Sequence, residues 1–150
     1  MSGPAGPFIL VGVDDGAIAK AALRWAADEA VLRNAPLTIV HAWQPIVPLE
    51  PAGMVTPPAN FDLEASARRI ATDLVGEVRS TQGQWPETWS VEIKEGPPGP
   101  VLVEMAHGAG LLVVGSHGHR ALAEVFLGSV SRHVTHHAPC PVVVVRPTPR

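Results

Sequence analysis

The chain has 150 residues, of which 46% are hydrophobic, and its formal net charge is -3. This length suits one domain with a single sizeable core, and the small negative charge gives no reason to expect nucleic acid or an anionic membrane as a partner. Cys140 is the only cysteine, which excludes an intrachain disulfide and favours a reducing compartment. No basic segment precedes the first apolar run and no apolar stretch approaches the roughly 18 residues of a membrane span, so we expect a cytoplasmic protein.

The first half of the chain alternates between strand and helix patterns. Residues 8–13 form a continuous apolar run, which predicts a strand buried on both faces. Apolar residues then recur at helical spacing over residues 18–33. Residues 37–43 predict a second buried strand, and the proline-rich residues 45–58 predict a long loop.

The same alternation continues in the second half. Helical spacing covers residues 61–80, 101–107 and 129–137, and strand patterns cover 89–93, 111–114 and 142–145. Strands that alternate with helices predict a single α/β domain, built on an open and largely parallel sheet with helices on both faces. In such sheets ligands bind beyond the carboxyl ends of the strands, and here the first and fourth strands end at Asp14 and Gly115.

The segment "GSHGHRALAEVFLGSVS", which starts at Gly115, carries the clearest functional pattern. Gly115 and Gly118 are followed by nine residues and then by Gly128 and Ser129. Glycines let the backbone approach a ligand closely, and the free N–H groups at a helix start favour an anion, so this spacing predicts two phosphate-binding turns. The Ser129 hydroxyl is expected to cap the helix or to donate to phosphate. The loop has no lysine, so Arg120, a divalent cation, or both are expected to offset the phosphate charge.

Together these segments resemble the universal stress protein family, in its ATP-binding branch. The resemblance runs through "ILVGVD", "LTIVHAW", "LLVVGSHG" and "LGSVSRHVTHHAPCPVVVVRP", and so covers nearly the whole chain. The family's phosphate motif, G-x-x-G, nine residues, then G-S/T, is met at the glycines named above and Ser129. The resemblance implies one domain over residues 1–150, a five-stranded sheet of order 3-2-1-4-5, and a homodimer that pairs the last strands.

The resemblance also assigns roles to individual residues. It implies that Asp14 contacts the ribose and metal region of ATP, and that the main chain at Ala42, after His41, recognises adenine. The ATP-binding residues predicted in this way are Gly12, Val13, Asp14, Ala42, Val114, Gly115, Gly118, Arg120, Gly128, Ser129 and Val130. Family members usually carry Gly-Ser where this chain has Asp15 and Gly16. If the Asp15 carboxylate faces the phosphates, ATP should need Mg²⁺ or Mn²⁺ to bind.

Simpler interpretations exist for several of these residues. The glycines are compatible with ordinary turns, and Asp14 with a cap of the first helix. His133 and His137 share a helical face on which a zinc site can be imagined, although no carboxylate or cysteine stands at a recognisable ligand spacing. Cys140 lies between prolines and is expected to be buried and inert.

The sequence therefore predicts an ATP-binding universal stress protein that acts as a nucleotide-responsive stress regulator. Catalysis is expected to be absent or slow, because no lysine is available in the phosphate loop to stabilise a leaving oxygen. Two alternatives stay open. One is a slow, metal-dependent ATP hydrolase that uses Asp14 or Asp15, and the other is a dimeric scaffold that binds no nucleotide.

Overall fold

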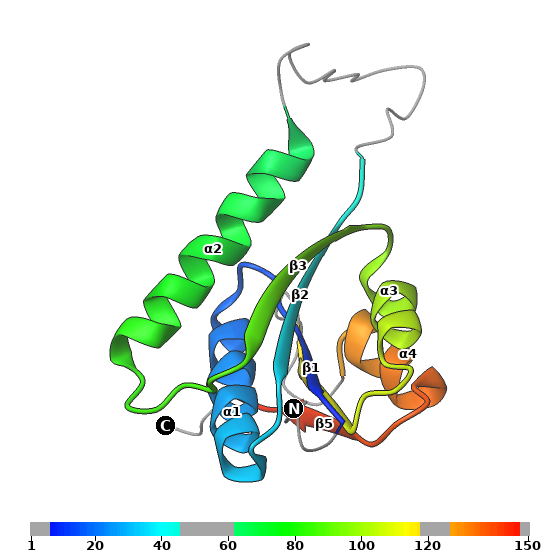
Figure 1. Cartoon of the computed structure of the whole chain (residues 1–150). Helices are drawn as coiled ribbons and strands as arrows, with labels where there is room; N and C mark the ends of the chain where they lie inside the picture. Colours follow the sequence, from blue (N-terminus) through cyan, green and yellow to red (C-terminus); the bar gives the residue numbers. More distant parts are fainter. Residues whose placement is uncertain (1–6, 46–61, 118–126, 148–150) are drawn as a thin grey trace, which may run out of the picture.

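The structure, a computed structural model, describes residues 7–45, 62–117 and 127–147. Strands and helices alternate along the chain (Figure 1). The strands are β1 (Ile9–Gly12), β2 (Leu37–Trp43), β3 (Trp89–Glu95), β4 (Leu111–Gly115) and β5 (Val142–Val145). The helices are α1 (Ala17–Arg33), α2 (Leu63–Thr81), α3 (Pro98–Met105) and α4 (Ser129–His137).

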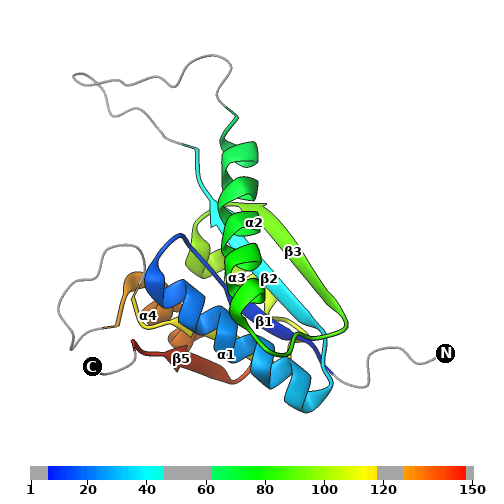
Figure 2. The same cartoon turned by 90° about the vertical axis from the view of Figure 1, so that its left-hand side faces the viewer.

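The five strands form one parallel sheet in the order β3-β2-β1-β4-β5. This confirms the predicted α/β fold and strand order. Helices α1 and α2 cover one face of the sheet, and α3 and α4 cover the other (Figures 1 and 2). The order in which strands are added reverses between β1 and β4, because β2 and β3 lie on one side of β1 and β4 and β5 on the other. The carboxyl ends of these two strands therefore open at the switch point where ligands bind in such sheets.

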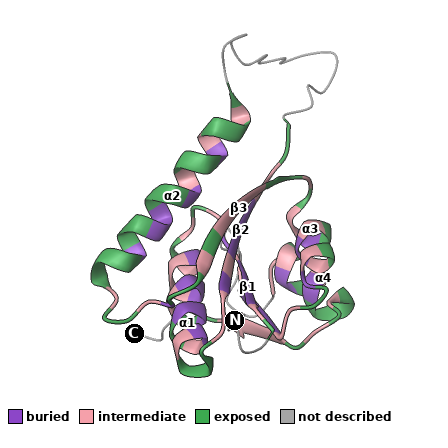
Figure 3. Cartoon of the chain, in the orientation of Figure 1, coloured by how far each residue is buried: buried purple, intermediate pink, exposed green. Residues whose placement is uncertain are grey.

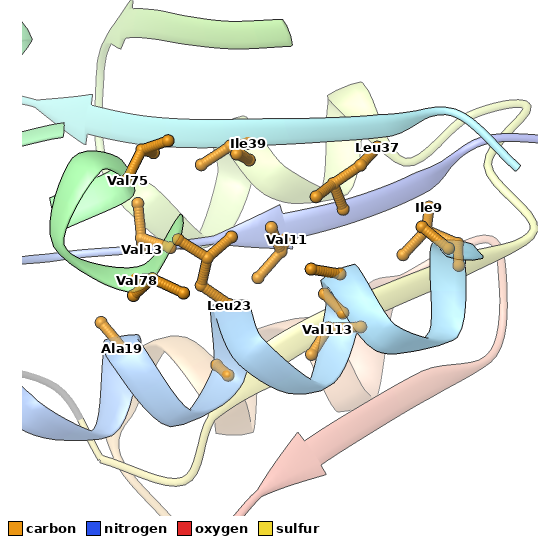
Figure 4. Close-up of a cluster of buried hydrophobic side chains, with 14 of the residues drawn as sticks. Ile9, Val11, Val13, Ala19, Leu23, Leu37, Ile39, Val75, Val78 and Val113 are labelled. Carbon is orange, nitrogen blue, oxygen red and sulfur yellow. The ribbon is translucent and has the colours of Figure 1, made fainter. Parts of the chain in front are cut away.

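Each face of the sheet has its own hydrophobic core. On the first face, Ile9 and Val11 of β1 pack with residues of α1 and α2, as Figure 4 shows. On the other face, Leu10 of β1 packs with Leu102 of α3 and Val134 of α4. Both faces of β1 and β4 are covered, and every residue of these strands except the last glycine of each is buried. Figure 3 shows β1 largely in purple, the colour of buried residues. This double burial explains why their sequences are continuous apolar runs and do not alternate with polar residues.

The largest difference from the predicted boundaries is at α3. The helix begins at Pro98, three residues before the predicted start at Val101. Proline fits the first turn of a helix because the N–H that it lacks has no partner there. The early start brings Gly99 against α4, where an added Cβ would lie 2.8 Å from the His133 ring. The predicted loop from residue 46 onward lies outside the described residues.

None of the described helices is both long and apolar enough to cross a lipid bilayer.

Candidate functional site

A pocket lies at the carboxyl ends of β1, β2 and β4, beside the first turns of α3 and α4. Its empty space, counted out to the open mouth, is about 670 Å³, which falls within the range of small-molecule sites. The lining residues are Gly12, Val13, Asp14, Ala19, Val40, Ala42, Pro98, Leu102, Val114, Gly115, His117, Gly128, Ser129, Val130 and Ser131.

All of the predicted ATP-binding residues that the structure describes line this pocket. They come from three separate strands and from the start of α4, so only the fold brings them together. Gly118 and Arg120 lie outside the described residues. The role of each residue toward ATP stays a prediction.

Strand β2 holds the end of β1 in place. Val13 donates its N–H to the carbonyl of Val40 at 2.9 Å. The carbonyl of Val13 lies 2.9 Å from Nδ1 of His41, a side chain that is only 9% exposed. Because a carbonyl can only accept, Nδ1 of His41 carries the proton. Both polar backbone groups of Val13 are therefore bonded to β2. These bonds fix the backbone at the point where the chain continues to Asp14.

Asp14 shapes the turn between β1 and α1. Its Oδ1 accepts a hydrogen bond from the backbone N–H of Gly16 at 2.8 Å. The N-cap of α1 is Gly16, and no side chain caps that helix. The interpretation of Asp14 as a helix cap is therefore wrong. It orders the preceding turn instead and leaves its carboxylate at the pocket.

Ser116 ties the end of β4 to the start of α4. It is fully buried, and its N–H donates to the carbonyl of Val145 at 2.8 Å. Its own carbonyl accepts from the N–H of Gly128 at 2.7 Å and from Oγ of Ser131 at 3.0 Å. These bonds place the first turn of α4 directly beside Gly115.

The start of α4 has the properties of an anion site. Its N-cap is Gly128, which has no side chain, and Ser129 is the first helical residue. Ser129 is therefore not the cap, contrary to one of its two expected roles, and its hydroxyl stays available at the pocket. The first N–H groups of a helix lack intrahelical partners, and the helix dipole favours negative charge there.

Asp15 does not face the pocket. Its side chain is exposed, and it is not among the described lining residues. Asp14, in contrast, is the carboxylate that lies in the described lining.

Sequence reasoning missed several lining residues. Pro98 and Leu102 come from α3, which no pattern connected with the site. Adding a Cβ to Gly12 would bring it 2.6 Å from Cδ1 of Leu102, so a glycine at this position allows α3 to pack close to β1. His117 lies inside the recognised motif, in one of its variable positions, and for that reason was not assigned. Trp43, in contrast, does not line the described pocket.

The histidines of α4 and Cys140 lie apart from this pocket. The rings of His133 and His137 have their centroids 4.6 Å apart. Across the residues that the structure describes, no group of three or more His, Cys, Asp or Glu side chains is placed to hold a metal ion. Cys140 is half-buried, not fully buried as expected, and burial raises the pKa of its thiol.

Comparison with known proteins agrees with this fold. The family model of the universal stress protein family matches residues 8–146. A universal stress protein of Mycolicibacterium smegmatis is 39% identical over 144 residues, covering 91% of this chain and 47% of the relative. The chain thus spans about half the length of the curated relatives it matches.

Two solved structures are also similar. A universal stress protein in complex with cAMP has a TM-score of 0.67 and 25% identity, with 95% of this chain and 98% of that chain covered. The universal stress protein from Archaeoglobus fulgidus in complex with dAMP has a TM-score of 0.66 and 26% identity, with 95% of this chain and 99% of that chain covered. The extent of these matches, together with the sheet order, shows that the chain belongs to the universal stress protein family.

Proposed function

We propose that this protein binds ATP in the pocket described above and acts as a nucleotide-responsive regulator in stress, with little or no catalysis. One observation carries the proposal: glycines and small side chains from β1, β4 and the start of α4 surround a single pocket at the switch point of the sheet. The likeness to universal stress proteins in complex with cAMP and dAMP supports an adenine nucleotide as the ligand.

The pocket offers different surroundings along its length. Near β2, Val40 and the main chain at Ala42 give an apolar wall suited to adenine. Between these two ends, we propose that Asp14 meets the ribose hydroxyls and a metal ion. At the other end, Gly115 and the first turn of α4 offer backbone N–H groups to the phosphates. This order, from base to phosphate, follows the sheet order β2-β1-β4.

A divalent cation fits this donor set. Mg²⁺ and Mn²⁺ prefer oxygen ligands, and Mg²⁺ is often held by one or two carboxylates together with substrate phosphates and water. Asp14 and the Ser129 hydroxyl supply oxygen atoms at the pocket. We propose that Asp14 holds Mg²⁺ or Mn²⁺ jointly with ATP, and that the ion offsets the phosphate charge.

The described lining residues explain why catalysis is expected to be weak. Neither lysine nor arginine occurs among them. Phosphoryl transfer depends on positive groups that stabilise the charge on the transferred phosphoryl and the leaving oxygen. A described lining without such groups suits a regulator that reports the nucleotide state.

We further propose that two copies pair through β5, and that the protein works in the cytoplasm. Strand β5 is at one edge of the sheet and is composed of four valines. An apolar edge of this kind is a template for a second strand. Pairing across a twofold axis would give hydrogen-bond partners to the edge N–H and C=O groups of β5 in both copies at once.

The decisive experiment is mass spectrometry of the nucleotide released when the purified protein is denatured, followed by calorimetry with ATP and Mg²⁺. We expect bound adenine nucleotide and saturable binding. Multiple turnovers per second with metal dependence would instead identify a hydrolase. Absence of released nucleotide together with absence of binding would leave only the scaffold interpretation.

A further inference from the structure

Two histidines lie close together on α4, away from the nucleotide pocket. His133 and His137 are four residues apart in the helix, so their side chains lie on the same side of it. Their ring centroids are 4.6 Å apart, with 42° between the ring planes. Neither residue is among those that line the pocket at the start of α4. This α4 histidine pair is therefore a feature that the proposed nucleotide function does not use.

The ring nitrogens of the pair are available to a ligand. In the described part of the chain, the histidines whose ring nitrogens make hydrogen bonds are His41 and His117. The nitrogens of His133 and His137 thus have no hydrogen-bond partner within those ranges. His137 is exposed and His133 is half-buried. A neutral imidazole keeps a lone pair on one nitrogen, and this lone pair is what binds a metal ion.

Helix α3 holds one ring of the pair in place. A Cβ added at Gly99 would lie 2.8 Å from Cδ2 and 2.9 Å from Cγ of His133, so the ring packs directly on the backbone of α3. A side chain that is already ordered loses less conformational freedom when it binds a ligand. His137 is exposed, so its ring is free to adjust to an ion that His133 holds.

The separation of the two rings indicates which ions fit. With about 2.0 Å from metal to nitrogen and about 1.2 Å from nitrogen to ring centre, two imidazoles bound at a right angle have centroids about 4.5 Å apart. The same distances give about 5.2 Å for the tetrahedral angle that Zn²⁺ prefers. The observed 4.6 Å matches the right angle. Right angles between ligands are typical of the square-planar and tetragonal sites of Cu²⁺ and Ni²⁺.

The electrostatics of the helix end also favour a cation. His137 is the last residue of α4, where carbonyl groups lack intrahelical partners and the helix dipole is negative. The positive side chain of Arg132 is directed toward the other end of the helix, because its guanidinium donates to the carbonyl of Leu127 at 3.4 Å.

We propose that His133 and His137 form a two-histidine site for a divalent transition-metal ion of the Cu²⁺ and Ni²⁺ class, with water in the remaining coordination positions. Cu²⁺ is the preferred ion, because nitrogen ligands bind it more tightly than Ni²⁺ or Zn²⁺. This site differs from the cation proposed beside ATP, which is held by oxygen atoms in the pocket. It therefore goes beyond the proposed function and does not depend on it.

The test is calorimetric titration of Cu²⁺ and Ni²⁺ into the wild type, His133→Ala, His137→Ala and the double variant. Nucleotide is left out, because ATP itself binds divalent ions. His136→Ala is the matched control, since consecutive residues of a helix do not face each other. We expect each single substitution to weaken Cu²⁺ binding about tenfold or more, because the second imidazole of a chelate binds intramolecularly. The double variant should bind little more weakly than either single variant, and His136→Ala should bind as the wild type does.

The remaining histidines are unchanged in these variants, so any binding to them is a constant background. Circular dichroism without metal shows whether each variant folds, and His137→Ala keeps the test valid if His133→Ala disturbs the contact with Gly99. Wild-type affinity for Cu²⁺ in His137→Ala would overturn the site, as would an equal loss in His136→Ala. Full additivity of the two single substitutions in the double variant would show that the rings do not share one ion. A wild type that binds ATP but no Cu²⁺ refutes this site and leaves the proposed function standing.

Discussion

Asp14 is the carboxylate that lines the described part of the pocket, and one of its oxygens is already in use. Oδ1 accepts the N–H of Gly16 and so keeps the turn before α1 in shape. The negative charge of the side chain is a separate property, which an amide would remove while keeping an oxygen acceptor for Gly16. Two substitutions can therefore separate the structural role from the electrostatic one.

We expect Asp14→Ala to lower ATP affinity about tenfold or more both with and without Mg²⁺, because the turn and the ribose contact are lost together. Asp14→Asn should lower affinity mainly in the presence of Mg²⁺, because only the charge is removed. Calorimetry in magnesium buffer and in chelator measures both effects. Asp15→Asn is the matched control, since Asp15 is exposed and outside the described lining. Equal affinities for Asp14→Ala and the wild type would contradict the assignment of Asp14 to the nucleotide.

Cys140 gives a prediction about pH. Burial raises the pKa of its thiol, and a hydrogen bond with the backbone of Leu112 acts in the opposite direction. The folded protein therefore favours the protonated thiol. Any stability from this preference is present below the pKa of the unfolded thiol and is lost as the pH rises through the raised, folded-state pKa.

Alkylation of Cys140 by iodoacetamide measures the difference between the thiol pKa of the folded protein and that of the unfolded chain. The thiolate is the reacting species, and the chain has one cysteine. We expect slower alkylation at pH 8 in the folded protein than in urea. The rate should rise at a higher pH in the folded protein than in the unfolded chain. Two rate profiles with the same midpoint would show that burial does not perturb this thiol.

At the scale of single elements, β5 is the edge strand through which we propose that two copies pair. Pro141 and Val145 accept hydrogen bonds from Leu112 and Ser116, so the backbone groups of these two residues point toward β4. Along a β-strand, the side to which the backbone N–H and C=O groups of a residue point alternates from one residue to the next. The N–H and C=O of Val144 therefore point to the free edge, where the proposed second copy would pair.

This alternation allows a substitution that removes the dimer without harming the sheet. Val144→Pro deletes an N–H at the free edge, a place where a strand tolerates proline, and we expect a folded monomer. Val145→Pro deletes an N–H on the β4 side and should lower the melting temperature instead. Sedimentation and circular dichroism measure the two effects. A wild type that sediments as a monomer at micromolar concentration removes the dimer, and a dimeric Val144→Pro protein places the interface elsewhere.

At the scale of the whole molecule, ligand binding and folding are linked. The described lining of the pocket comes from three strands and three helices, so the pocket exists only in the folded state. A ligand that binds only the folded state at 100 times its Kd raises the free energy of unfolding by about 2.7 kcal/mol. For a chain of this size that corresponds to a shift in Tm of roughly 5–10 °C.

We expect ATP with Mg²⁺ to raise the Tm by an amount in this range, and EDTA to reverse most of the rise while ATP is still present. Adenosine should give a smaller shift because it lacks the phosphates that meet α4 and the cation. Differential scanning calorimetry at fixed protein concentration is the measurement. An equal rise with ATP in EDTA would mean that binding needs no divalent cation.

Much of the fold could be predicted from the sequence because local patterns have local causes. The strand at residues 37–43, the helix at 129–137 and the strand at 142–145 agree with the structure residue for residue. Continuous apolar runs mark strands that are covered on both faces, and helical spacing marks one apolar side. The strand order followed from the family resemblance, not from these patterns, since several orders satisfy the same alternation of strands and helices.

For the site, the sequence by itself determined which glycines and which acidic residue follow the strands, because glycine spacing and strand ends are visible along the chain. Three further features follow from the tertiary structure: Leu102 closes against Gly12, Asp15 is exposed outside the described pocket lining, and His41 fixes the end of β1. Each of these depends on contacts between residues far apart in the chain or on the direction of a side chain, and both are set by how the helices pack on the sheet.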